Sequence, residues 1–247
     1  VATGSVSNYF GNKDFEEYGV GLKTINDSLN IRSLILQNFE KAANSCDPDE
    51  KDMLTNVVIV GGGPAGVEMA GALAEFKRYV LPKDYSEFDK DNMKIYLVQA
   101  GGQLLEAMSE KASVQTAKDL KKMGVKVIFN CRVKGYDGVT VDLGNGEFLK
   151  AATLVWTAGV KGTYPKGIPE EAMIGGGRIL VDDTLKVRGT DNIYAIGDIA
   201  GMISDDLPRG HPMVAQVAMQ EGQFLANNIK RSLKGQKPLP FSYVDKG

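Results

Sequence analysis

Cysteine and histidine are scarce in this sequence. The two cysteines, Cys46 and Cys131, lie far apart and neither belongs to a C-x-x-C pair, which argues against a disulfide framework or a thiolate metal site. With His211 as the single histidine, a histidine-rich metal centre or a Ser–His–Asp triad is not expected either. We therefore expect no metal, and a reducing compartment such as the cytosol.

Long apolar runs and an excess of one charge are also missing. No apolar run approaches the ~18 residues that a membrane-spanning helix needs, and no signal peptide is visible. The 29 Lys and Arg residues are balanced by 31 Asp and Glu residues, without a basic stripe, so no nucleic-acid partner is expected. Contact with a membrane would have to come from an interfacial surface or from a segment outside this chain.

The chain does contain a regular alternation of strand and helix patterns. Residues 57–60 form a continuous β-branched apolar run, which is typical of a strand buried on both faces of a parallel sheet. Further strands are expected in KIYLVQA, ending near Gln99, and in VKVIFN, with helices over 22–44, 64–79 and 109–123. This order predicts an α/β fold with a doubly wound, Rossmann-like parallel sheet.

The pattern changes in the second half of the chain. Alternating residues on both sides of Asn145-Gly146 predict a β-hairpin, followed by an apolar strand over 153–157. A short strand pair is expected in GRILVDDTLKV, then a strand in NIYAIGD that ends at Asp198. The last helix is expected over 213–233.

A glycine turn links the strand at 57–60 to the next helix, which begins near Pro64. Gly61, Gly63 and Gly66 match G-x-G-x-x-G, and the flanking strand and helix make this match specific. The first glycine permits a tight turn, the second lets a pyrophosphate approach the backbone, and the third allows close helix–strand packing. The pyrophosphate would then bind at the helix N-terminus, so Gly61, Gly63, Pro64 and Gly66 are the expected cofactor-binding residues of this turn. The alternative is a strand–helix turn that binds no ligand.

Gln99 occupies the position where a dinucleotide site usually has an acidic residue that binds the ribose hydroxyls. Glutamine can still accept a hydrogen bond, but it does not repel a 2′-phosphate. No arginine follows directly to bind that phosphate. We therefore expect NADH to be preferred and NADPH to be possible.

Several motifs together resemble a known family. These are VATGS at 1–5, VIVGGGPAGVEMAGALAE at 58–75, LVWTAGV at 154–160 and NIYAIGDIA at 192–200. They resemble the pyridine nucleotide-disulfide oxidoreductase superfamily of two-dinucleotide flavoproteins. AQVAMQEGQFLANNI and the terminal FSYVDKG are similar to the type II NADH:quinone oxidoreductases in particular.

The resemblance implies an NAD(P)H domain inserted into a FAD domain. The expected parts are a partial FAD domain with a linker helix over 1–50, an NAD(P)H domain over 51–156, and a second partial FAD domain with the quinone-site helix over 157–247. The chain has one G-x-G-x-x-G fingerprint, and a FAD domain of this type needs its own. We therefore expect an internal segment of a longer protein, inactive by itself.

The resemblance also implies which residues bind FAD. They are those of the ATG and AIGD motifs, with the glycine of WTAG near a cofactor: Ala2, Thr3, Gly4, Asp198 and Gly159. Asp198 would also suit a helix start, where it would cap the backbone.

The same resemblance implies a catalytic acid and a quinone site. Glu68 matches a residue near the contact of nicotinamide and flavin; the alternative is an acid that complements the helix dipole. Gln216 and Gln220 match the quinone-site motif and share a helix face, although they could also be part of a solvated face.

The implied activity is hydride transfer from NADH to FAD and then to a membrane quinone, without proton pumping. The chain lacks the reactive C-x4-C pair of the disulfide reductases, which favours a non-thiol acceptor. The enzyme would lie on the cytoplasmic side of the inner membrane as a peripheral protein and could form a homodimer. The alternatives are a flavin reductase with another acceptor and a non-catalytic NADH-binding module.

Overall fold

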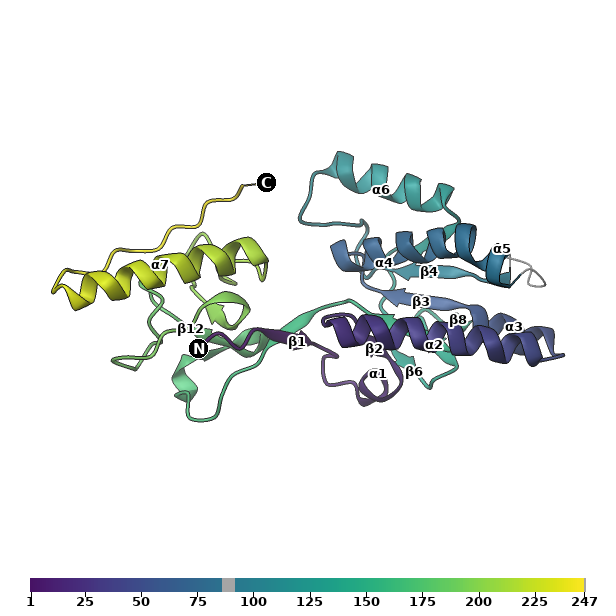
Figure 1. The fold of residues 1–247 in the computed structure, drawn as a ribbon, viewed down its shortest axis with the longest axis horizontal. Coiled ribbons are helices and arrows are strands. Elements are labelled where there is room, and N and C mark those ends of the chain that lie inside the picture. Colours follow the sequence, from purple (N-terminus) through teal and green to yellow (C-terminus); the bar gives the residue numbers. More distant parts are fainter. Residues whose placement is uncertain (86–91, 247) are drawn as a thin grey trace. The chain divides into compact units, whose positions relative to one another are not determined.

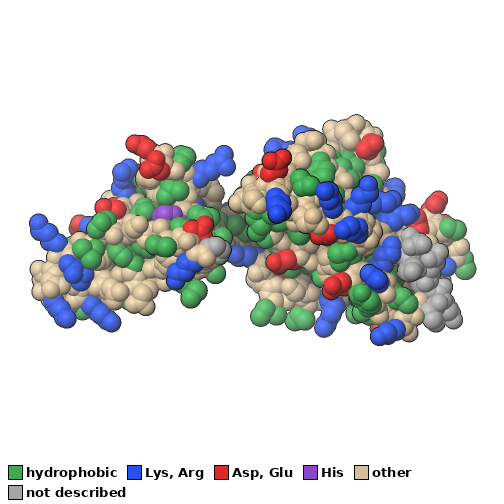
Figure 2. Space-filling model, turned by 90° about the horizontal axis from the view of Figure 1, so that it is seen from above, with side chains coloured by type: hydrophobic (Ala, Val, Ile, Leu, Met, Phe, Trp, Pro, Cys, Tyr) green, Lys and Arg blue, Asp and Glu red, His purple; other side chains and the backbone are tan. Residues whose placement is uncertain are grey.

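The computed structural model describes residues 1–85 and 92–246. The chain forms two compact units, one of residues 7–159 and the other of residues 1–6 together with 160–247. Acidic, basic and hydrophobic side chains all occur over each unit on the face shown in Figure 2. In the described part of the chain, no helix combines the length and the apolar character that crossing a bilayer requires.

A five-stranded parallel sheet forms the centre of the 7–159 unit and confirms the predicted α/β fold (Figure 1). Its spatial order is β2 (Val20–Gly21), β9 (Thr153–Trp156), β3 (Val57–Val60), β4 (Ile95–Val98) and β5 (Val125–Ile128). Val60 lies opposite Trp156 on one side and Val98 on the other, so the carboxyl ends of these strands meet at one edge. Ligands of such sheets bind at this edge.

Helices α2 (Ile25–Asn44), α4 (Pro64–Glu75) and α6 (Glu110–Lys122) follow the predicted pattern, and α1 (Lys13–Tyr18) and α3 (Pro48–Thr55) are short. Helix α2 begins with a capping box of Thr24 and Asp27. Its buried face packs with β3 into one apolar core. The helix that we expected to be a linker is therefore part of the 7–159 unit.

The helix predicted over 64–79 changes its geometry at its end. Helix α4 ends at Glu75 and is followed by a π-helical turn, η1 (Phe76–Val80), and by α5 (Leu81–Asp84). Residues 86–91 of the polar stretch that follows lie outside the described part of the chain.

An antiparallel meander of β6 (Gly135–Tyr136), β7 (Thr140–Asp142) and β8 (Phe148–Lys150) completes this unit. Strands β7 and β8 form the hairpin predicted around Asn145-Gly146, with Val141 opposite Leu149. The meander shares a second apolar core with β3, β9 and α1.

The other unit contains residues 5 and 6 of β1 (Ser5–Ser7), which pairs with β10 (Val160–Gly162). It also contains a small sheet of β11 (Met173–Ile174), β12 (Arg178–Leu180) and β13 (Ala200–Gly201). Its long helix is α7 (Ala215–Leu233), close to the predicted bounds.

The strand predicted over 192–198 was wrong. Tyr194 forms only an isolated bridge with Lys186, and Gly197–Ile199 is a 3-10 turn, η5. The backbone of this segment bonds to Leu185 and Val187 and also to the first residue of the chain. The Val1 amino group donates to the Tyr194 carbonyl at 2.6 Å, and the Ile196 N–H donates to the Val1 carbonyl at 3.0 Å. A partner so distant in sequence leaves no local pattern.

Candidate functional site

The three glycines of the turn have different surroundings. Gly61 has a φ of +114°, and an added Cβ would lie 2.8 Å from the backbone of Ala158. At Gly66 an added Cβ would lie 1.9 Å from the Gly61 carbonyl oxygen. At Gly63 it would meet nothing within 4 Å. Gly61 and Gly66 are therefore required by packing, whereas Gly63 faces open space where a ligand can approach.

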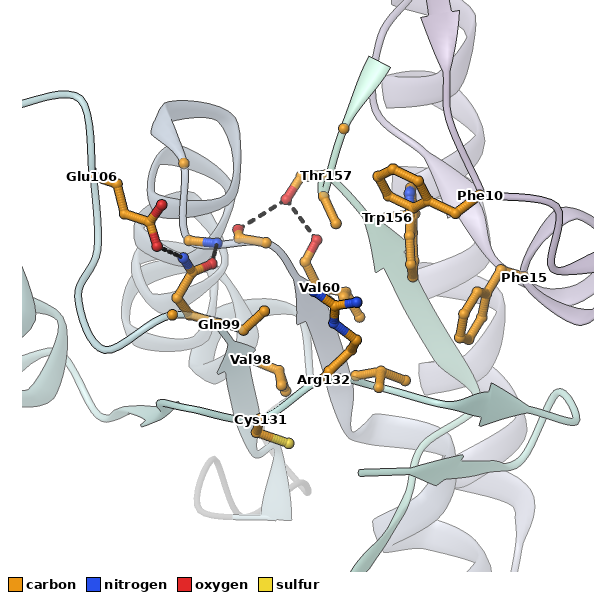
Figure 3. A pocket seen from close by; sticks show the side chains of 18 of the residues that line it. Phe10, Phe15, Val60, Val98, Gln99, Glu106, Cys131, Arg132, Trp156 and Thr157 are labelled. Atoms are coloured by element: carbon orange, nitrogen blue, oxygen red, sulfur yellow. Dashed lines mark hydrogen bonds between the residues drawn. The ribbon is translucent and has the colours of Figure 1, made fainter. Parts of the chain in front are cut away.

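Thr157 fixes the start of this turn. Its hydroxyl lies 2.9 Å from the Val60 carbonyl oxygen and 3.0 Å from that of Gly61, at the end of β9 (Figure 3). The sequence analysis considered the WTAG motif only for Gly159 and missed Thr157. The signal was present, since a hydroxyl two residues before that glycine lies at the same sheet edge as the fingerprint.

The N-terminus of α4 is open to an anion. Gly63 is its N-cap and supplies no side-chain hydrogen bond, and Pro64 occupies the first turn. The backbone N–H groups at such an end and the positive end of the helix dipole favour negative charge. This arrangement suits a pyrophosphate.

A cavity of about 880 Å³ lies beside the turn, wholly within the 7–159 unit (Figure 3). Its volume is within the range of small-molecule sites. The glycine turn, the segment from Val98 to Met108 and an aromatic group contribute to its lining, and Arg132 and Lys134 add positive charge.

The aromatic group of the cavity comes from α1, the loop before it and β9. Phe15 stacks on Trp156 with a centroid distance of 4.5 Å, and the Trp156 indole N–H donates to the Asn8 carbonyl at 2.8 Å. Phe10 has a φ of +52° and lies over Gly159, where an added Cβ would be 3.1 Å from its ring. Gly159 thus lines the cavity. Trp156 belongs to the WTAG motif, which the sequence analysis considered only for its glycine, and Phe10 and Phe15 were missed because they follow no motif.

Gln99, which we expected to lie at the ribose, has hydrogen-bond partners within the chain, and its contact with a ribose stays a prediction. Its Oε1 accepts a hydrogen bond from the Gly62 N–H at 2.8 Å, and its Nε2 donates to Glu106 Oε1 at 2.9 Å. The side chain therefore connects the glycine turn to a carboxylate that also lines the cavity. Neither Gly62 nor Glu106 was identified from the sequence.

Glu68 lies away from this cavity. It is the fifth residue of α4, its side chain is exposed, and it is not among the residues that line the cavity. It also lies beyond the first turn of the helix, where the dipole acts most strongly. Its catalytic role stays a prediction.

The predicted FAD residues of the other unit come together at its N-terminal segment. The Ser5 hydroxyl donates to Asp198 Oδ2 at 2.5 Å, and the Gly4 carbonyl accepts from the Thr163 N–H at 3.1 Å, while Thr3 bonds to the Thr163 carbonyl. Gly4 has a φ of +69°, and an added Cβ there would meet nothing within 4 Å. Ala2 and Thr3 are exposed, so this backbone is open to a ligand beside the Asp198 carboxylate.

The sequence analysis missed Glu221, a buried carboxyl group that contacts the residue before Asp198. Glu221 on α7 is 1% exposed and accepts a hydrogen bond from the Gly197 N–H at 2.6 Å. Burial raises the pKa of Glu221 to about 7; the Gly197 hydrogen bond and the Arg178 charge oppose the rise, and the Asp198 charge adds to it. The hydrogen bond between Gly197 and Glu221 holds η5, the turn on which Asp198 lies.

Gln216 and Gln220 lie on one face of α7, and both bond to the terminal segment 244–246. The Gln220 amide exchanges two hydrogen bonds with the Val244 backbone, at 2.8 and 3.0 Å. Gln216 Oε1 accepts from the Lys246 N–H at 3.3 Å. A role toward a quinone stays a prediction.

No metal centre is evident in the residues that the structure describes, since no three His, Cys, Asp or Glu side chains gather there in a way that could hold an ion.

Comparison with known proteins gives consistent matches. The family model described as pyridine nucleotide-disulphide oxidoreductase matches residues 1–222. The type II NADH:quinone oxidoreductase Ndh of Mycobacterium tuberculosis is 34% identical over 258 residues, covering 100% of this chain and 54% of that protein. The corresponding protein of Staphylococcus epidermidis is 33% identical and is 61% covered. The chain thus spans little more than half the length of these relatives.

A solved structure of NDH2 from Plasmodium falciparum in complex with NADH is similar in fold. It has a TM-score of 0.88 at 22% identity, over 100% of this chain and 66% of the other.

Proposed function

The chain belongs to the pyridine nucleotide-disulphide oxidoreductase family, and from this membership we propose that it forms the NADH-binding part of a flavin-dependent oxidoreductase that transfers a hydride from NADH to a quinone. Its relatives from Mycobacterium tuberculosis and Staphylococcus epidermidis carry this activity in their names.

The observation that carries the NADH site is the open position at Gly63. Packing requires Gly61 and Gly66, but nothing in the described chain requires a glycine at 63, where an added Cβ meets no atom within 4 Å. Absence of a side chain there leaves room for a ligand at an uncapped helix N-terminus. In this proposal the pyrophosphate of NADH lies there, and the cavity of the same unit holds other parts of the nucleotide.

FAD would be held by Ala2, Thr3, Gly4 and Asp198, with Gly159 near a cofactor. The open backbone at Gly4 beside the Asp198 carboxylate fits a ligand with hydroxyl groups, because a carboxylate accepts their hydrogen bonds. The flavin, when bound, supplies the two-electron chemistry. The residues of this chain position it, and η5 is kept in place by Glu221.

Glu68 is proposed to assist proton or hydride transfer, and Gln216 and Gln220 to donate hydrogen bonds to a quinone carbonyl. In this structure both amides bond to residues 244–246. Quinone binding through them would therefore require that segment to give up these bonds. A peripheral position on the cytoplasmic side of the inner membrane and a homodimer belong to the same proposal.

Calorimetry of NADH binding to the 247-residue chain tests the nucleotide site. Gly63→Val should weaken binding at least about tenfold, or ~1.4 kcal/mol, because its side chain occupies the space for the pyrophosphate. Gly71→Val is the matched control, since an added Cβ at Gly71 on the same helix also meets nothing within 4 Å. Equal affinities of the two variants, or no binding by the wild type, would refute the site.

A further inference from the structure

We propose that Glu106, held in place by Gln99, is the residue that distinguishes NADH from NADPH, because its carboxylate binds the ribose hydroxyls of the adenosine half and repels a 2′-phosphate. This inference rests on the NADH site proposed above and assigns the charged group that the fingerprint lacks at Gln99.

The hydrogen bonds give the Gln99 amide one orientation. The Gly62 N–H can only donate and the Glu106 carboxylate can only accept, so Gln99 must present Oε1 to the first and Nε2 to the second. In the opposite orientation, the Nε2 donor would face the Gly62 N–H donor, and the Oε1 acceptor would face the Glu106 carboxylate, which is also an acceptor. Gln99 therefore directs one carboxylate oxygen of Glu106 toward the glycine turn.

The backbone around Glu106 is attached to the same turn. The Leu105 N–H donates to the Gly62 carbonyl at 2.8 Å, and the fully buried Leu104 side chain packs where an added Cβ at Gly62 would lie, 2.5 Å from its Cδ2. Gly101 permits close approach of the carboxylate, since an added Cβ there would be 2.0 Å from Glu106 Oε1. The position of Glu106 is thus determined by contacts, although its side chain is exposed.

The charges favour a hydroxyl over a phosphate at this place. Dinucleotide sites use a carboxylate after the second strand to accept hydrogen bonds from the ribose. Here the residue after β4, Gln99, is neutral, and it bonds to the carboxylate of Glu106, which lines the cavity. Oε2 of Glu106 accepts no hydrogen bond from the described residues and can bind a ribose hydroxyl, whereas a 2′-phosphate would be repelled.

Arg132 and Lys134 line the same cavity with the opposite charge. Figure 3 shows Arg132 near Val60 and Trp156, on the other side of Gln99 from Glu106. If either cation contacted the 2′ position, the chain would favour NADPH. The test therefore compares the two nucleotides directly.

The experiment measures the dissociation constants of NADH and NADPH for the 247-residue chain by calorimetry. The wild type should prefer NADH, and Glu106→Gln should reduce the NADPH/NADH ratio of dissociation constants about tenfold, which is ~1.4 kcal/mol. Glu110→Gln is the matched control, because Glu110 is an exposed carboxylate nearby that does not line this cavity. An unchanged ratio in Glu106→Gln, with NADH still bound, would overturn the proposal.

Gln99→Glu in the Glu106→Gln background tests whether the carboxylate charge causes the preference. It moves the charge to position 99, where a glutamate can still accept the Gly62 N–H, and should restore the preference for NADH. A ratio that stays at that of Glu106→Gln would contradict discrimination by a carboxylate beside the glycine turn. Failure of the wild type to bind either nucleotide would instead refute the proposed function itself.

Discussion

Gly61, Gly63 and Gly66 belong to one motif, yet an added Cβ would meet different surroundings at each. Two of them are required because backbone atoms lie within 3 Å of that position, and the third faces open space. The same distinction separates residues that determine stability from those that determine binding. Substitutions at Gly61 and Gly66 should therefore lower stability, whereas a substitution at Gly63 should weaken ligand binding.

Gly66→Ala should destabilise the 7–159 unit. The added methyl group would be 1.9 Å from the Gly61 carbonyl oxygen, so the turn or the helix must move, and overpacking of this kind costs about 1–3 kcal/mol or more. Urea unfolding measures the effect. Gly71→Ala, in the interior of the same helix, should be neutral or stabilise by up to ~1 kcal/mol. Equal stability of Gly66→Ala and wild type would contradict the packing role.

Glu221 should make stability depend on pH. Its carboxyl pKa is raised from 4.5 to about 7, chiefly by burial, so the native state keeps a proton that the unfolded chain loses between these values. Unfolding then releases a proton, and the free energy of unfolding should fall by up to about 3 kcal/mol as pH rises through this window and level off above it.

Thermal unfolding between pH 4 and 8 tests this, because Glu221→Gln should flatten the decline. Glutamine keeps the shape and still accepts the Gly197 N–H, but it does not ionise. Glu170→Gln, at an exposed carboxylate of the same unit, should retain the wild-type slope. The same decline in Glu221→Gln and wild type would assign the pH dependence to other groups.

At the scale of elements, helix α7 holds the terminal segment through amide side chains rather than through a strand. Gln220 and Asn228 each exchange two hydrogen bonds with a backbone residue of that segment, Val244 and Leu239 respectively. Amides suit this task because each offers an acceptor to the N–H and a donor to the C=O of the same residue. The buried Phe241 side chain and the hydrogen bond from its N–H to the Asp183 carbonyl add to the attachment of the segment.

Gln220→Leu should release the end of this segment. Loss of both bonds to Val244 removes about 1–2 kcal/mol of local stability, so hydrogen exchange of the Val244 amide should accelerate about tenfold. Gln223→Leu is the control, since Gln223 is exposed on the same helix. If exchange at Val244 is the same in the two variants, the amide contacts do not hold the segment.

At the scale of the whole molecule, all residues that line the cavity belong to one compact unit. They lie between Tyr9 and Gly159, within residues 7–159, and so does the complete parallel sheet. In the proposed function, nucleotide binding therefore belongs to residues 7–159, whereas the quinone-site helix α7 belongs to the other unit.

A protein of residues 7–159 alone should fold and bind NADH with an affinity within about threefold, ~0.65 kcal/mol, of that of the 247-residue chain. The reason is that no residue of the cavity is lost. Circular dichroism checks the fold and calorimetry the affinity. A folded 7–159 protein that does not bind, beside a longer chain that does, would show that residues outside this unit complete the site.

The parallel α/β sheet, the β7–β8 hairpin and the glycine turn at the start of α4 could all be predicted from the sequence. These features depend on the side-chain period and on the backbone freedom of glycine, which act between neighbours in the chain. Three features became visible only in the folded chain: β9 lies between β2 and β3, Tyr194 and Ile196 bond to Val1, and Gln99 connects Gly62 to Glu106. A polar side chain takes its hydrogen-bond partner from whichever group folding brings within about 3 Å, and sequence spacing contains no information about that distance.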